Sequence, residues 1–87
     1  MKVVHIQAVQ GSSVLRGFAD VEVWPEVIIR GFRILNSPEG LHVAVPEIKI
    51  YNARGQRTFL SMLQVPRKLM EEINRVVLEA WQVGGAE

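Results

Sequence analysis

The stretch ILNSPEGLHVAVP (residues 34–46) places two short apolar segments on either side of a break at Asn36–Gly40. Pro38 has a fixed φ angle and Gly40 tolerates a positive φ, and both properties are typical of β-turns. Apolar and polar residues alternate from Leu41 to Val45, as in a strand with one buried face. The stretch therefore predicts a hairpin with a five-residue loop, within an antiparallel meander.

Two further strands are predicted upstream of this hairpin, at Val3–Val9 and Val14–Val23. The second alternates clearly, and one face is expected to carry Leu15, Gly17, Ala19, Val21 and Val23. Trp24-Pro25-Glu26 should end that strand, because proline cannot donate a ladder hydrogen bond. Trp24 itself is expected to be a packing residue, like Trp81.

The next segment, Val27 to Leu35, is rich in β-branched and aromatic residues on both faces. Strict alternation would put Val27, Ile29 and Leu35 with Arg33 on one face, and Ile28, Phe32 and Ile34 with Arg30 on the other. A strand that is apolar on both faces is typical of a central strand covered twice.

The C-terminal part predicts one helix. Glu47–Arg57 is polar and is expected to form a basic loop or extended arm, while Phe59–Val65 is more typical of a short strand than of a helix. The helix should begin near Pro66 and end at Gly84-Gly85. Its apolar stripe is expected to consist of Leu69, Ile73, Val76, Val77, Ala80 and Trp81.

These elements predict a single α+β domain over residues 1–87, with an antiparallel meander of four to five strands and a C-terminal α-helix. One helix covers only one face of such a sheet, so a strand that is apolar on both faces would leave a large exposed apolar patch. A homodimer would bury this patch across a two-fold axis. A monomer whose basic arm folds back as a lid is the alternative.

The composition argues against several classes of protein. The chain has no cysteine, so disulfides and cysteine-ligated zinc are excluded. The N-terminus does not have the pattern of a signal peptide, and no apolar run approaches the roughly 18 residues of a membrane span, so we expect a cytoplasmic protein without membrane contact. His5 and His42 have no further ligands at suitable spacing, and no catalytic set of residues stands out. We expect neither enzyme activity, nor a metal or cofactor, nor a small-molecule substrate.

The charge distribution is more informative than the net charge of +1. The segment from Arg30 to Lys68 contains seven basic and two acidic residues, a net charge of +5. The remainder of the chain contains three basic and seven acidic residues, a net charge of −4. Such asymmetry suggests an anionic partner for the middle of the chain.

The candidate nucleic-acid-binding residues are the seven cations of this middle segment: Arg30, Arg33, Lys49, Arg54, Arg57, Arg67 and Lys68. Their side chains would neutralise phosphates and release counterions. The alternative is that they are solubilising surface charges, partly paired with glutamates.

Two pairs of residues, one basic and one aromatic, each have more than one possible role. Arg67 and Lys68 lie in the expected first helical turn, where their interaction with the helix dipole is unfavourable. A bound anion, or the nearby Glu71 and Glu72, would offset this cost. Tyr51 and Phe59 flank the basic arm and suit stacking on unpaired bases, but core or dimer contacts would also explain them.

The order of these motifs resembles the stage V sporulation protein G family, the bacterial septation regulators. The matching stretches are LRGFADVEV (15–23), VIIRGFRIL (27–35), GLHVAVP (40–46) and the helix entry Val65-Pro66 with Ile73 and Val77-Leu78. The resemblance spans roughly residues 3–81. It implies a dimeric α/β protein that binds DNA or RNA as a regulator of septation and sporulation.

Two departures from the family pattern stand beside this resemblance. Glu47-Ile48-Lys49 follows the proline where the family usually has a small polar residue and a base, and the sequence ends at WQVGGAE, without the further helical tail of many members.

Two other functions stay open. The first is a non-catalytic protein-interaction module of the cell-division or transcription machinery, and the second is a structural subunit of a larger assembly.

Overall fold

The structure, a computed structural model, describes residues 1–85 and confirms the α+β class. A four-stranded antiparallel sheet has the order β1-β2-β3-β4, and a separate two-stranded sheet pairs β5 with β6. The elements are β1 (Lys2–Ala8), β2 (Leu15–Trp24), β3 (Val27–Ser37), β4 (Gly40–Ala44), β5 (Glu47–Tyr51), β6 (Arg57–Ser61), α1 (Arg67–Ala80) and a π-helical turn, η1 (Trp81–Gly85).

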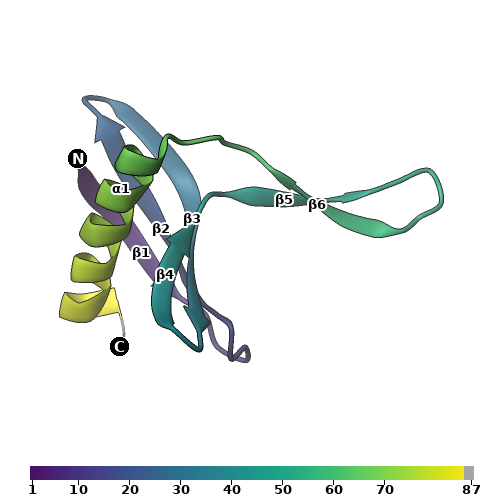
Figure 1. Cartoon of the computed structure of the whole chain (residues 1–87), viewed down its shortest axis with the longest axis horizontal. Coiled ribbons are helices and arrows are strands. Elements are labelled where there is room, and N and C mark those ends of the chain that lie inside the picture. The colour runs from purple at the N-terminus through teal and green to yellow at the C-terminus, as the bar shows by residue number, and fades with distance from the viewer. Residues whose placement is uncertain (86–87) are drawn as a thin grey trace.

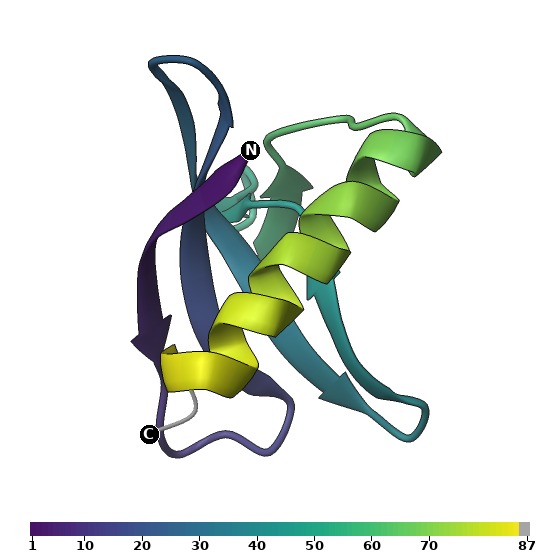
Figure 2. The ribbon, with the colours of Figure 1, turned by 90° about the vertical axis from the view of Figure 1, so that its left-hand side faces the viewer.

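The helix and the two-stranded sheet lie on opposite sides of the main sheet. Figure 1 shows α1 packed against one face, while β5 and β6 extend from the other side as a separate ribbon, which we call the arm. Figure 2 shows that α1 crosses the sheet diagonally. The arm is extended, so the alternative of a monomer with the arm folded back as a lid does not describe this structure.

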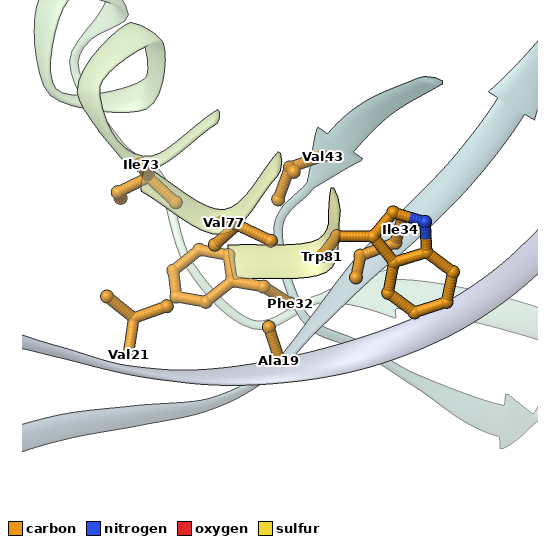
Figure 3. Close-up of a cluster of buried hydrophobic side chains, with 8 residues drawn as sticks. All are labelled: Ala19, Val21, Phe32, Ile34, Val43, Ile73, Val77 and Trp81. Atoms are coloured by element: carbon orange, nitrogen blue, oxygen red, sulfur yellow. The ribbon is translucent and has the colours of Figure 1, made fainter. Parts of the chain in front are cut away.

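The core lies between α1 and the main sheet. Figure 3 shows the side chains that meet there: Ala19, Val21, Phe32, Ile34, Val43, Ile73, Val77 and Trp81. The predicted inward face of β2 is confirmed from Gly17 to Val23, because Gly17, Ala19 and Val21 are buried and Val23 packs against the core. Leu15 is an exception, because a register shift pairs it with Leu35 and it does not pack on the core. The predicted stripe of the helix is confirmed at Ile73, Val77 and Trp81, whereas Leu69 is exposed.

The predicted faces of β3 are wrong in one respect, because a β-bulge interrupts its alternation. Ala19 pairs with Phe32 and Val21 with Ile29, so two residues of β3 lie opposite the single residue Asp20. Gly31 adopts a φ of 86° there, which glycine tolerates readily. Ile29 therefore packs on the core side, the same side as Phe32, instead of the side predicted by strict alternation.

Both faces of β3 were expected to be apolar and therefore to need a covering layer. The bulge removes this reason, because it moves Ile29 to the core side. The face opposite the helix is mixed, since its paired residues include Phe18 and Arg33, Glu22 and Ile28, and Leu35 and His42. The packing role expected for Trp24 is also wrong, because this side chain is 71% exposed beside the β2–β3 turn.

Both tight turns of the main sheet use a proline followed by a glutamate. Trp24 pairs with Val27, and Ser37 pairs with Gly40, so each turn has only two central residues. The predicted five-residue loop is therefore shorter than expected, because Asn36 and Ser37 continue β3. Glu26 has a φ of 67°, the left-handed conformation that the second central residue of a type II turn requires.

Two contacts position the helix on the sheet. Asn74 Oδ1 accepts a hydrogen bond of 2.9 Å from the backbone N–H of Val43, and this bond occupies an outward-facing donor on the edge strand β4. At the other end of the helix, the Trp81 ring covers Gly17, where a side chain has no room. A Cβ at Gly17 would lie 2.6 Å from the carbonyl oxygen of Gln7 and 2.7 Å from Cζ3 of Trp81.

We predict that Gly17→Ala lowers the free energy of unfolding by about 1–3 kcal/mol, because the new methyl group displaces Trp81 or β1. Gly84→Ala is the matched control, since a Cβ there meets nothing within 4 Å. Urea titration followed by Trp fluorescence measures both variants. Equal stability of Gly17→Ala and the parent chain would contradict the close packing of Trp81 on β2.

Candidate nucleic-acid interface

The arm is a β-hairpin whose turn is organised by one side chain. Asn52 Oδ1 accepts hydrogen bonds of 2.9 Å from the backbone N–H groups of Arg54 and Gln56, and Asn52 Nδ2 donates to Gln56 Oε1. Gly55 completes the turn with a φ of 77°. Arg54 therefore lies at the tip of the arm in a defined turn, and the arm predicted for Glu47–Arg57 is a hairpin that includes β6.

The register of the arm gives it two different faces. Lys49 lies opposite Phe59, and Tyr51 lies opposite Arg57, so these two cations and two aromatic rings share one face. We call this the basic face. Ile48 lies opposite Leu60 and Ile50 opposite Thr58 on the other side, which we call the apolar face.

The basic face is open to solvent. Tyr51 is 65% exposed and Phe59 is 54% exposed, so neither ring is a core residue. The Arg57 guanidinium carbon lies 5.7 Å from the centre of the Phe59 ring, within the range of a cation–π contact. A ribbon with rings between cations presents both phosphate-neutralising and base-stacking groups to a ligand.

Arg33 has a different environment from the arm cations. Its Nε donates to the carbonyl oxygen of Val45 at 3.1 Å, and its Nη1 lies 3.2 Å from Glu47 Oε1. The side chains of Arg33 and Glu47 are only 22% and 25% exposed. Arg33 therefore holds the base of the arm to β3. This favours the alternative of a cation paired with a glutamate and leaves little of the guanidinium for a ligand.

The remaining predicted cations lie apart from the arm. Arg30 is exposed on β3, and Arg67 and Lys68 are exposed in the first turn of α1. Arg67 Nε lies 3.3 Å from Glu71 Oε1, which favours the alternative that a nearby glutamate offsets the dipole cost. The structure thus brings Lys49, Arg54 and Arg57 together on the arm.

The apolar face of the arm was missed by the sequence reasoning. Ile48 is 45% exposed, Ile50 36% and Leu60 49%. The signal was present in EIKIY (47–51), where apolar residues alternate with polar ones just before a turn with Asn52 and Gly55. In the segment that follows, Asn52, Arg54, Gln56 and Arg57 are polar or basic, so charge is its more prominent feature.

Within residues 1–85, no group of three histidine or acidic side chains lies close enough to hold a metal ion. No helix in this part of the chain is long and apolar enough to cross a membrane.

Comparison with known proteins adds no relative to this description. No protein-family model matches the sequence, and no curated protein matches it. The resemblance to the septation regulators therefore rests on the stretches quoted above.

We predict that Arg33→Met lowers the free energy of unfolding by about 1–3 kcal/mol, because Glu47 and the Val45 carbonyl lose a half-buried charged partner. Hydrogen exchange should also accelerate in β5. Arg67→Met is the control, since its ion pair is exposed and such pairs contribute about 0–1 kcal/mol. If both variants had the same stability, the contacts of Arg33 would not hold the arm.

Proposed function

We propose that this protein is a non-catalytic nucleic-acid-binding regulator of the cytoplasm that acts as a homodimer, as its resemblance to the septation regulators implies. The observation that carries the proposal is the basic face of the arm, with Lys49, Tyr51, Arg57 and Phe59 on one side of a ribbon and Arg54 at its tip. The cations supply affinity for phosphates, and the rings supply stacking surfaces.

The shape of the arm suits the same ligand. A two-stranded ribbon fits the major groove of duplex DNA, and exposed rings between cations suit unpaired bases. The arm extends from the sheet on the side opposite the helix, so no other element covers it in Figure 1. The exposure of both rings favours single-stranded DNA or RNA over duplex as the preferred form.

A protein-interaction module is the second candidate function. It is favoured by the exposed apolar face of the same arm, which a partner of the division or transcription machinery would bury. The two functions differ in their response to salt, because binding to a polyanion weakens steeply as salt concentration rises.

We predict that a labelled single-stranded oligonucleotide binds with a log–log salt slope of about −0.7 per neutralised phosphate, measured by fluorescence anisotropy. Arg54→Ala combined with Arg57→Ala should weaken binding and flatten the slope by about 1.4 for each arm engaged. Arg16→Ala combined with Arg75→Ala removes the same charge elsewhere and should have a much smaller effect. Equal losses in both double variants would move the site away from the arm, and no binding at low salt would favour the interaction module.

We further predict that Tyr51→Ala or Phe59→Ala weakens single-strand binding by about 1–3 kcal/mol, because each removes a stacking surface. Tyr51→Phe keeps the ring and should bind like the parent chain. The same anisotropy titration with a duplex of equal length separates stacking from charge. Unchanged single-strand affinity in both alanine variants would show that the rings do not stack on bases.

A further inference from the structure

A hollow lies at one end of the main sheet, where the β2–β3 turn, the N-terminus and the first half of α1 meet. Its volume is about 540 Å³, within the range of about 300–1,000 Å³ that ligand pockets have. Its lining includes Met1, Glu22, Trp24, Pro25, Leu69 and Glu72. In Figure 1 the β2–β3 turn lies at the upper left, beside the start of α1, whereas the arm extends to the right. The hollow is therefore separate from both faces of the arm.

Exposed apolar side chains give the hollow the character of a protein-interaction site. Trp24 is 71% exposed, Met1 39% and Leu69 36%. Trp24 pairs with Val27 across a turn of two central residues, so the backbone that carries the indole ring is already ordered. Tryptophan is enriched among the residues that carry most of the binding energy of interfaces, and a pre-ordered residue loses little entropy on binding. A partner that covers Trp24 would therefore gain affinity.

The charges of the hollow favour a cationic partner. Two carboxylates line it, Glu22 from β2 and Glu72 from α1, whereas the nearby Lys2 and Lys68 do not. Within residues 1–85 neither carboxylate forms an ion pair, although Glu71, next to Glu72, pairs with an arginine. All residues that line the hollow belong to the part of the chain that has a net charge of −4.

We propose that this hollow docks a basic segment of another protein. An apolar side chain of the segment packs against Trp24 and Leu69, and a neighbouring lysine or arginine pairs with Glu22 and Glu72. A lysine or arginine close to the indole ring also gains a cation–π contact. The proposal goes beyond the nucleic-acid-binding function proposed above and does not depend on it.

Two other occupants fit the hollow less well. The two carboxylates repel a nucleic acid. The arm of a second copy carries cations and apolar side chains, but the strand cations Lys49 and Arg57 lie on the face opposite Ile48 and Ile50, so one arm does not present both to the hollow. In a partner segment the cation and the apolar residue share one side, as residues two apart do in a strand and residues three or four apart do in a helix.

The test selects partner segments by their chemistry. A phage-displayed library of random peptides is selected on the full chain, and the enriched peptides are synthesised with a fluorescent label and titrated by anisotropy. We expect these peptides to combine a lysine or arginine with an aliphatic or aromatic residue, and to bind more weakly as the salt concentration rises. Because Trp24 is exposed and Trp81 is buried, an unlabelled peptide should also shift the tryptophan fluorescence to shorter wavelength.

Two sets of variants separate the apolar contact from the charges. Trp24→Ala should raise the dissociation constant of the selected peptides about 30-fold, because it removes the aromatic side chain on which they pack. Val83→Ala is the control, since Val83 is 87% exposed and does not line the hollow.

Glu22→Gln combined with Glu72→Gln should raise the same dissociation constant about tenfold and reduce its dependence on salt. Glu39→Gln combined with Glu79→Gln removes the same charge outside the hollow and should bind the peptides like the parent chain.

Circular dichroism checks that each variant is folded, and the glutamine variants test the proposal independently of Trp24→Ala. A library that yields no binder, or peptides that bind the parent chain, Trp24→Ala and the Glu22/Glu72 double variant equally, would overturn the proposal. Light scattering distinguishes a second copy from another protein: a molecular mass that falls in Trp24→Ala relative to the parent chain would identify a second copy as the occupant, and the proposal would fail.

Discussion

The hydrogen bond of 3.0 Å that the backbone N–H of Gly31 donates to Asp20 Oδ1 holds the β-bulge on which the rest of the structure depends. The bulge returns Ile29 to the core side, so one helix suffices to cover the apolar face of β3. Beyond it, β4 ends opposite Arg33, and Pro46 lies 3.8 Å from where a Cβ at Gly31 would be. The chain leaves the main sheet at this point and forms the arm, while the first half of β3 keeps an open edge.

The arm derives its character from its alternation and from its lack of a core. Residues of a β-strand point alternately to opposite faces, so EIKIY separates Ile48 and Ile50 from Lys49 and Tyr51 without any further device. In a ribbon covered on one side, the apolar face would be buried and the polar face would be exposed. Here both faces are exposed, and the free energy of covering the apolar face remains available to a partner.

The sequence predicts an element well where alternation is regular and poorly where one residue is inserted. The inward face predicted for β2 is found as expected from Gly17 to Val23, whereas Leu15 lies beyond a register shift. Val27–Leu35 looks equally regular, yet the residue inserted at Gly31 reverses the side on which Ile29 lies; a glycine within a strand pattern was the available signal. The seven cations form one set in the sequence, but Arg33 is half-buried against Glu47, and only the register of β5 with β6 shows which of the others share a face.

The homodimer of the proposed function would carry two arms, each with its own basic face. A two-stranded ribbon is marginally stable alone, so a ligand that orders it loses binding free energy to the lost conformational entropy. A partner already bound to the apolar face of the arm would have ordered the ribbon and would remove part of this cost. Two arms fixed on one body would also bind neighbouring phosphates as a single bivalent surface, at a high effective concentration. The bound fraction of a long polyanion should therefore rise more steeply with protein concentration than the bound fraction of an oligonucleotide that reaches only one arm. This difference follows from the two faces of one short hairpin.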